Sequence, residues 1–136
     1  MTVEDKGRVR DCMKPEVTEV DGRIDVLSAL KIMKRDSVTS LIVKRRDEND
    51  EYGMVLFSDI AKKVIGKDRA PERVNVYEIM AKPVITVGPN MHIRYCARLF
   101  QNFGINHAPV EEDGKIIGMV SYYRLVLYGL KDLIGE

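Results

Sequence analysis

Residues 13–43, MKPEVTEVDGRIDVLSALKIMKRDSVTSLIV, align without a gap on residues 80–110, MAKPVITVGPNMHIRYCARLFQNFGINHAPV. The offset is 67 positions, and two extra residues in the first copy then place Gly53-Met54-Val55 on Gly118-Met119-Val120. Apolar positions are shared throughout, as expected when one structural unit occurs twice. The repeat predicts a body with pseudo-twofold symmetry and matching clefts where the two units meet.

Each copy has the same predicted order of elements, β-α-β-β-α, which gives an α+β fold with sandwich-like packing. The evidence is the β-branched strand segments, the helical three- and four-residue apolar spacing, and the polar turns between them. In the first copy we predict strands at 17–20, 40–43 and 52–57 and helices at 24–33 and 60–65. In the second copy we predict strands at 84–87, 108–110 and 116–120 and helices at 93–103 and 122–133.

The helix boundaries carry their own signals. Ser58 or Asp59 is expected to open the last helix of the first copy, and Ser121 that of the second, because serine and aspartate are good N-caps. Gly104 has the character of a C-cap glycine. A short additional element is expected before each first strand, at 9–13 and 76–80.

The predicted domain limits follow the repeat. We expect an N-terminal extension at 1–8, a first repeat at 9–65, a polar connection at 66–75, and a second repeat with its C-terminal helix at 76–136. Because units of about 60 residues bury little surface alone, the repeats are expected to share one core.

Composition excludes several classes of function. Lys plus Arg total 22 and Asp plus Glu total 21, a balance that disfavours a nucleic-acid partner. The chain has neither a long apolar run nor a signal-peptide pattern, so we predict a cytoplasmic protein without a membrane partner. Cys12 and Cys96 lack metal-site spacing, and Cys96 is expected to be buried on a helix.

No catalytic set is recognisable in the sequence. There are only two histidines, and the phosphate-loop, nucleophile-elbow and HExxH patterns are absent. We therefore predict that the chain is not an enzyme, has no catalytic residues, binds no metal and requires no cofactor.

The repeated element order, the methionine and proline before each first strand, and the glycine with two apolar residues before each last helix resemble a tandem cystathionine beta-synthase (CBS) domain pair, or Bateman module. The resemblance covers about residues 9–127. It implies a stand-alone regulatory module that binds AMP, ADP, ATP or S-adenosylmethionine between the repeats. Family members carry Gly, two apolar residues, Ser or Thr, two variable residues and Asp at the last strand-to-helix turn.

The resemblance implies one adenosyl site centred on Asp59, whose carboxylate can accept hydrogen bonds from both ribose hydroxyls. Leu56 replaces the hydroxyl residue of the family pattern, which removes one phosphate contact. The remaining implied residues of this site come from the same turn and from the second repeat: Met54, Val55, Phe57, Ser58, Ile85, Thr86, Asn106, His107 and Pro109. Only His107 could add a positive charge there, so we expect a ligand with little phosphate charge, such as AMP or an adenosine thioether, to be preferred over ATP.

The second implied cleft is altered. Ser121 keeps the hydroxyl, but Arg124 stands in place of the acid, and arginine carries only donors. Thr18, Thr39 and Ser40 would complete this cleft. We expect Arg124 to exclude adenosine, with binding of a different anion as the alternative.

Simpler interpretations stay open for the same residues. Asp59 could act only as a helix cap, Arg124 could pair with an acidic neighbour, and His92 is expected on the surface. For the whole chain, the resemblance implies a homodimer that signals to an effector protein in trans. The alternatives are a ligand-free dimerisation or docking scaffold with degenerate clefts and, less favoured, a nucleic-acid accessory protein.

Overall fold

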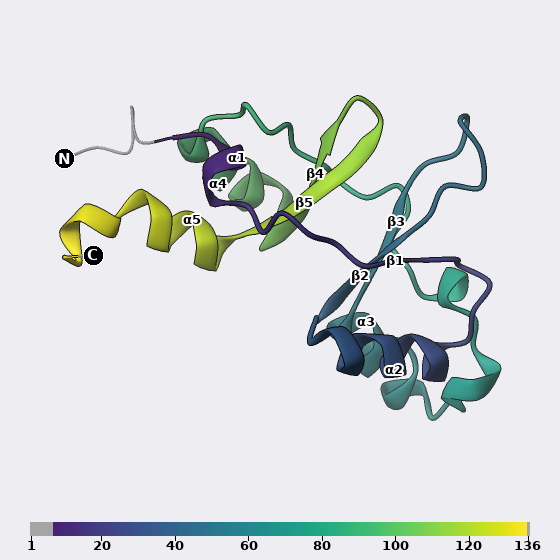
Figure 1. The fold of residues 1–136 in the computed structure, drawn as a ribbon. Coiled ribbons are helices and arrows are strands. Elements are labelled where there is room, and N and C mark those ends of the chain that lie inside the picture. Colours follow the sequence, from purple (N-terminus) through teal and green to yellow (C-terminus); the bar gives the residue numbers. More distant parts are fainter. Residues whose placement is uncertain (1–6, 136) are drawn as a thin grey trace. The chain divides into compact units, whose positions relative to one another are not determined.

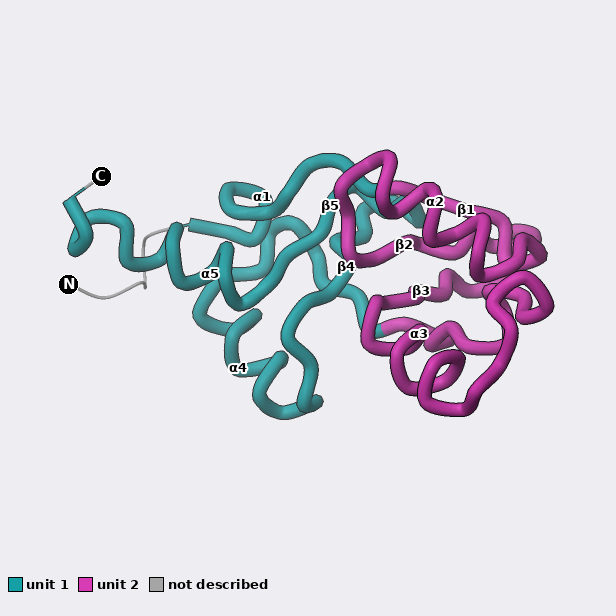
Figure 2. The backbone as a smooth tube through the Cα atoms, turned by 90° about the horizontal axis from the view of Figure 1, so that it is seen from below, with its two compact units in different colours: residues 1–17, 85–136 teal, residues 18–84 magenta. Residues whose placement is uncertain are grey.

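The computed structural model describes residues 7–135, which form two compact units (Figure 2). One unit contains residues 18–84, and the other combines residues up to 17 with residues from 85 onward. The boundaries at 17/18 and 84/85 cut across the predicted repeats, because each unit contains the leading segment of the other repeat. Most of the predicted N-terminal extension at 1–8 lies outside the described residues.

The unit of residues 18–84 is built on a three-stranded sheet with the order β1-β2-β3 (Figure 1). β1 pairs parallel with β2, and β2 pairs antiparallel with β3. In Figure 1 both of its α-helices lie below these strands. The elements are β1 (Glu19–Val20), α2 (Val26–Asp36), β2 (Ser40–Val43), β3 (Gly53–Leu56) and α3 (Phe57–Lys63), with 3₁₀ turns at Ile65–Lys67, Pro71–Arg73 and Val76–Glu78.

This unit has its own hydrophobic core. The core joins one face of α2, the inner side of the sheet, α3 and the segment that follows it. Its fully buried members include Met33, Leu41, Val55, Val64 and Val76. Burial of such side chains contributes about 1.5–3 kcal/mol each. The connection predicted at 66–75 therefore contributes Val74 to this core, and Val76 follows directly after it.

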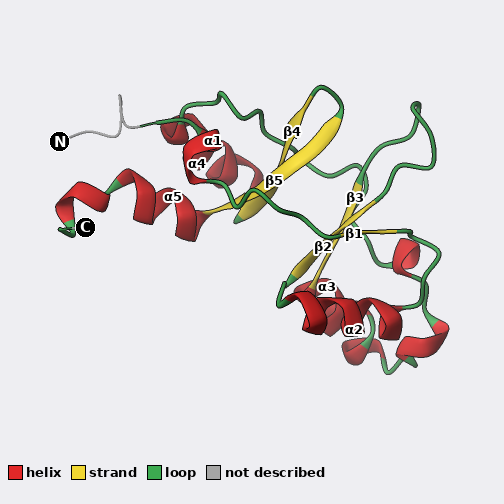
Figure 3. Cartoon of the chain, viewed as in Figure 1, coloured by secondary structure: helices red, strands yellow, loops and turns green. Residues whose placement is uncertain are grey.

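Among its described residues, the other unit has one hairpin and three α-helices, drawn in yellow and red in Figure 3. Its elements are α1 (Val9–Cys12), α4 (Ile93–Phe103), β4 (His107–Glu112), β5 (Lys115–Ser121) and α5 (Tyr122–Gly129), with a 3₁₀ turn at Lys131–Leu133. Asp113 and Gly114 have φ angles of 53° and 78°, the left-handed conformation of the expected hairpin turn. Phe100 and Cys96 are fully buried in a second core, as predicted for Cys96.

The strand predicted at 84–87 is not formed as a strand. Only Val87 bridges to Val110, through its amide to the Pro109 carbonyl at 3.0 Å and its carbonyl to the Glu111 amide at 2.9 Å. In the first repeat the equivalent of Pro109 is Ile42, whose amide donates to Thr18 at 2.9 Å. Because proline has no N–H, the matching bond cannot form, and the strand is reduced to one bridge.

The methionine that precedes each first strand packs against a glycine of the other repeat, and the two glycines occupy equivalent positions. A Cβ on Gly53 would lie 2.7 Å from the Met80 Sδ, and a Cβ on Gly118 would lie 2.7 Å from the Met13 Sδ. Each glycine therefore admits the leading segment of the other repeat against its strand. Backbone bonds fix the same contacts, with Met54 pairing with Ala81 and Met119 with Lys14.

The two long helices begin at equivalent positions with different caps. Asp25 accepts from the Ser28 amide at 2.8 Å to cap α2, and the His92 Nδ1 accepts from the Arg94 amide at 3.2 Å to cap α4. His92 is only 7% exposed, so the prediction of a surface histidine was wrong. Its alignment with the capping Asp25 was the signal for this role. Gly104 ends α4 at φ 65°, as predicted.

Candidate functional site

The turn that carries Asp59 joins β3 to α3. Contrary to the prediction, neither Ser58 nor Asp59 is the N-cap: the helix begins at Phe57, and Leu56 occupies the cap position. Asp59 lies in the first turn, and its Oδ2 accepts from the Leu56 amide at 2.9 Å. Its side chain is 18% exposed. The carboxylate is therefore oriented by the backbone of its own turn.

At the equivalent turn of the second repeat, the cap residue itself accepts the hydrogen bond. Ser121 is the N-cap of α5, as predicted, and its Oγ accepts from the Arg124 amide at 3.3 Å. In a full capping box both the cap side chain and the acid three residues later bond to backbone amides. Each repeat retains one half of that arrangement.

Arg124 has a structural role that the sequence did not reveal. Its Nε donates to the Cys12 carbonyl at 2.7 Å, and its Nη2 donates to the Met13 carbonyl at 3.4 Å. Within residues 7–135 Arg124 forms no ion pair with a carboxylate, in contrast to the simpler interpretation from sequence. The guanidinium attaches the start of α5 to the end of α1.

In the unit of residues 18–84 a different side chain performs the equivalent task. The Lys63 Nζ donates to the Ile79 carbonyl at 3.0 Å, and Ile79 aligns with Cys12 in the repeat. Lys63 also lies 3.8 Å from the Asp59 Oδ1, one helical turn away. Asp59 therefore has a cationic neighbour, while its Oδ1 accepts no short hydrogen bond from that neighbour.

Other residues predicted for the second cleft lie beside the Asp59 turn. Ser40 pairs with Leu56 in the antiparallel register, and the Phe57 amide donates to the Thr39 carbonyl at 3.1 Å. The Thr18 Oγ1 donates to the Asp36 Oδ2 at 3.0 Å. The hairpin register could have indicated the proximity of Ser40 to Leu56, since each lies three residues from the end of its strand that faces the hairpin turn.

The residues that the second repeat was expected to supply lie within the other unit. His107 pairs with Ser121 across the hairpin, and its Nδ1 contacts the Asn106 Oδ1. The Thr86 Oγ1 donates to the Glu111 Oε1 at 3.0 Å, and Pro109 is buried in β4. Ile85 is 36% exposed. The prediction that these residues complete the Asp59 site stays a prediction.

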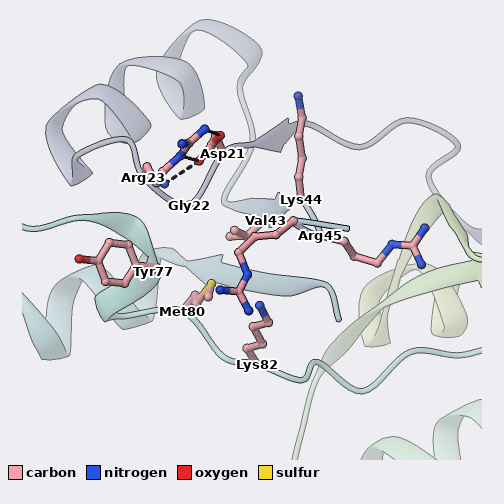
Figure 4. Close-up of a pocket in the computed structure, with 10 residues that line it drawn as sticks. Asp21, Gly22, Arg23, Val43, Lys44, Arg45, Tyr77, Met80 and Lys82 are labelled. Atoms are coloured by element: carbon pink, nitrogen blue, oxygen red, sulfur yellow. Dashed lines mark hydrogen bonds and ion pairs between the residues drawn. The ribbon is translucent and has the colours of Figure 1, made fainter. Parts of the chain in front are cut away.

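The sequence did not reveal a pocket at the other end of the three-stranded sheet. A cavity of about 710 Å³ lies among residues 21–23 after β1, residues 43–46 at the end of β2, and Tyr77, Met80 and Lys82 (Figure 4). The only sequence signal was the basic run Lys44-Arg45-Arg46, which was interpreted as part of a polar turn. Tyr77 and Lys82 come from a distant segment, so their contribution was not predictable from that run.

Two carboxyl groups at this pocket have strongly perturbed acidity. The Arg23 side chain donates to Asp21 at 2.8 and 3.0 Å and is the main cause of its pKa falling to about 2. The Arg46 guanidinium, followed by the Lys82 ammonium, holds the pKa of Asp50 far below its ordinary range. Both carboxylates are therefore ionised at neutral pH.

The environment of the two cysteines is apolar, and the burial predicted for Cys96 is confirmed. Cys12 and Cys96 are unbridged and buried, and desolvation raises the pKa of the Cys96 thiol to about 12. In the described part of the chain, no cluster of three or more His, Cys, Asp or Glu residues is arranged for a metal ion. Among the same residues, no helix is both long and apolar enough to cross a bilayer.

Comparison with known proteins identifies the repeat. The family model for the CBS domain matches twice, at residues 9–66 and 76–131. The uncharacterized protein MK0525 of Methanopyrus kandleri is 32% identical over 94 residues, which cover 68% of this chain and 47% of that protein. This chain thus spans about half the length of that relative.

Solved structures share the fold. The hexameric CBS-CP12 protein from bloom-forming cyanobacteria has a TM-score of 0.87 at 33% identity, over 95% of this chain and 75% of that one. The CBS domain pair of protein MJ0100, in complex with 5′-methylthioadenosine and S-adenosylmethionine, has a TM-score of 0.72 at 22% identity, over 94% and 95% of the two chains. With two matched domains that together span most of its length, the chain belongs to the CBS domain family as a tandem CBS pair.

Proposed function

We propose that this CBS pair is a non-enzymatic regulatory module that binds an adenosyl ligand at Asp59 and transmits the bound state to a partner protein. The observation that carries the proposal is the Asp59 carboxylate, which is oriented by the Leu56 amide and remains partly exposed. A carboxylate has about four lone-pair sites, and one backbone bond occupies one of them. The remaining acceptor capacity suits the vicinal hydroxyls of a ribose.

The two turns support a single adenosyl site. Asp59 offers acceptors, whereas Arg124 offers only donors and uses them on the carbonyls of Cys12 and Met13. A ribose at the Arg124 turn would have to compete with these backbone bonds. We therefore propose that the Arg124 turn excludes adenosine and that one ligand binds per chain at the Asp59 turn.

The charges near Asp59 favour a ligand with little phosphate charge. Lys63 is its nearest cation, and the Lys63 ammonium already donates to the Ile79 carbonyl. His107, the predicted source of positive charge, contacts Asn106. We propose AMP, 5′-methylthioadenosine or S-adenosylmethionine as the ligand class, ahead of ATP. The MJ0100 pair supports this at the level of the fold, since it is a CBS pair in complex with 5′-methylthioadenosine and S-adenosylmethionine.

A thermal-shift panel with AMP, ADP, ATP, 5′-methylthioadenosine and S-adenosylmethionine tests the proposal. Native protein is compared with Asp59→Ala and Asp59→Asn, because asparagine can still accept from the Leu56 amide while it loses the charge. Lys62→Ala, an exposed residue of the same helix that is outside the predicted site, is the matched control. A stabilising shift that persists in Lys62→Ala and is lost in Asp59→Ala supports the site.

Three results would contradict parts of this proposal. If no adenosyl ligand shifts the native protein, the ligand-free scaffold replaces the sensor as the function. If Asp59→Ala binds as tightly as native protein, Asp59 is only a helix cap. Calorimetry in which ATP binds tenfold more tightly than AMP at the site that Asp59→Ala removes would contradict the proposed ligand class.

We also propose that the module self-associates through α5. Apolar side chains on this helix and the following turn recur at three- and four-residue spacing and stay exposed, which is typical of a helix that packs on a partner. These residues are Tyr122, Tyr123, Val126, Leu127, Leu130, Leu133 and Ile134. The relative CBS-CP12 protein is a hexamer. Light scattering should give a dimer or larger, and Val126→Glu together with Leu130→Glu should give a monomer; a native monomer would exclude self-association.

A ligand can regulate such an assembly only through unequal affinity for its conformations. The effector in trans therefore has to discriminate the ligand-bound from the free arrangement. Pull-down experiments with and without the ligand identified in the thermal-shift panel test this step, and equal capture of every partner in both states would argue against signalling.

A further inference from the structure

We propose that the basic pocket at the end of β1 and β2 is a second binding site, for a small molecule that carries a diphosphate or longer phosphate chain. The pocket is separate from the Asp59 turn within the same unit. Ser40 and Leu56 pair at the Asp59 end of the hairpin, and Val43 and Gly53 pair at the pocket end. Three residues of strand separate the two ends by about 10 Å.

The frame of the pocket is fixed by backbone bonds. The Tyr77 amide donates to the Gly22 carbonyl at 2.9 Å, and the Lys44 amide donates to the Val20 carbonyl at 2.9 Å. A Cβ on Gly22 would lie 3.1 Å from Val43 and 3.4 Å from the Tyr77 side chain, so the absence of a side chain permits this close approach. Backbone bonds and this close approach therefore define the frame of the cavity.

The charge of the pocket suits an anion. Five cationic side chains, Arg23, Lys44, Arg45, Arg46 and Lys82, surround it and outnumber the carboxylates of Asp21 and Asp50. Asp21 is occupied by both nitrogens of the Arg23 fork, which reduces its repulsion of an anion. Figure 4 shows the Lys44 and Arg45 side chains pointing away from Met80 and Lys82. The remaining three cations exceed the two carboxylates by one charge, which suits an anion.

Two of the cations are held in place by one carboxylate. The Lys82 Nζ lies 2.7 Å from the Asp50 Oδ1, and the Arg46 Nε lies 3.1 Å from the Asp50 Oδ2. The Asp50 side chain is only 9% exposed, while that of Arg46 is 82% exposed. One carboxylate cannot neutralise two cations, and each cation keeps unused N–H donors. Phosphate oxygens are the acceptors that such fixed cations bind best.

Apolar and aromatic side chains also line the pocket. Figure 4 shows Met80 near Val43 and Lys82, with the Tyr77 ring farther to the left. Tyr77 is 52% exposed although the 3₁₀ turn around it is packed into the core. Its ring can stack on a planar group attached to the phosphates. The cavity volume of about 710 Å³ lies in the range of small-molecule sites.

Calorimetry at low ionic strength with ADP and inorganic pyrophosphate tests the site in the Asp59→Ala background, where the proposed adenosyl site is removed. Both probes should bind, and Lys82→Met should weaken both by about tenfold, since a charge-assisted bond is lost. Lys62→Met on the exposed side of α3 removes the same charge elsewhere and should leave both affinities unchanged. If the natural ligand carries a ring, Tyr77→Ala should weaken the binding of ADP but not that of pyrophosphate. If a free phosphate chain is recognised, Tyr77→Ala should leave the binding of both probes unchanged.

The proposal is overturned if neither probe binds, or if Lys82→Met and Lys62→Met have the same effect. Arg46→Met provides a second variant with an exposed side chain in case Lys82→Met is poorly folded. This outcome is independent of the adenosyl site, which is tested by the binding of AMP and S-adenosylmethionine to native protein and to Asp59→Ala.

Discussion

The turns Leu56–Asp59 and Ser121–Arg124 open equivalent helices, and they divide the tasks of one helix start between different side chains. At the first turn the acid three residues after the cap bonds to the cap amide; at the second the cap hydroxyl bonds to the amide three residues later. Both solutions satisfy a backbone amide. Only the first leaves a carboxylate oxygen available to a ligand.

The same comparison extends to the leading segments. Arg124 binds the Cys12 carbonyl directly, whereas Asp59 cannot donate, and Lys63 binds the equivalent Ile79 carbonyl from one turn further along the helix. The structural task has moved to another residue in the repeat that keeps the acid. The difference teaches that, in a duplicated turn, a neighbouring side chain can take over the packing role and leave the residue at the turn free of it.

The largest expected effect concerns the glycines that admit the leading segments. A Cβ at Gly118 would lie 2.6 Å from the Lys14 carbonyl oxygen, a backbone atom, whereas the nearest atom to a Cβ at Gly53 is the flexible Met80 Sδ at 2.7 Å. We expect Gly118→Ala to destabilise the protein by about 3 kcal/mol and Gly53→Ala by about 1 kcal/mol. Urea denaturation measures both, and the reverse order would show that the two contacts are not distinguished in this way.

The next effect concerns the side chains that hold those segments. Arg124→Ala should lower the free energy of unfolding by about 2 kcal/mol, because it leaves partly buried carbonyls without their charged donor. Lys63→Ala should cost under about 1 kcal/mol, because its side chain is 45% exposed. If urea denaturation showed equal losses of stability for Arg124→Ala and Lys63→Ala, the two side chains would not differ in how strongly they hold the leading segments, contrary to this account.

The two half-boxes should have similar capping energies. We expect Asp59→Ala and Ser121→Ala each to cost about 1 kcal/mol without ligand, since each removes one cap bond. Asp59→Asn should recover most of that loss. If Asp59→Ala were neutral in thermal denaturation, the bond to the Leu56 amide would contribute nothing to folding.

The smallest effect is an acid dependence of the unit of residues 18–84. Arg23 lowers the pKa of Asp21 to about 2, and Arg46 and Lys82 lower that of Asp50. Because the folded pKa values are depressed, their stabilisation is present above about pH 4, the ordinary aspartate pKa, and is lost as the pH falls towards 2. The Asp50→Asn protein should take up about one proton fewer than native protein when it unfolds in acid. If the stability of the two proteins depended on pH in the same way between pH 4 and 2, Asp50 would make no such contribution.

Much of the fold was predictable because it depends on local patterns. The strand at 40–43, the amphipathic helices, the turn at Asp113-Gly114 and the burial of Cys96 follow from period and turn chemistry. The loss of the strand at 84–87 depends on a missing N–H at Pro109, which is distant in sequence. Its effect becomes clear only once the parallel pairing partner is known.

The candidate site was predictable only in part. Asp59 was recognisable from its motif. The start of the helix was predicted wrongly, because Ser58 or Asp59 was assumed to be the cap, whereas Leu56 occupies that position. The roles of Arg124 and Lys63 depend on carbonyls of a leading segment that belongs to the other repeat, and sequence spacing does not encode that exchange. The Arg46–Asp50–Lys82 cluster was missed for the same reason.

The number of adenosyl ligands bound per chain tests the central claim most directly. Titration calorimetry with AMP and with S-adenosylmethionine, on native protein, Asp59→Ala and Arg124→Ala, should be performed at matched ionic strength. For the preferred ligand, the unequal turns predict one site per chain, lost in Asp59→Ala and retained in Arg124→Ala. Two equivalent sites per chain, or one site that survives Asp59→Ala and disappears in Arg124→Ala, would contradict the account.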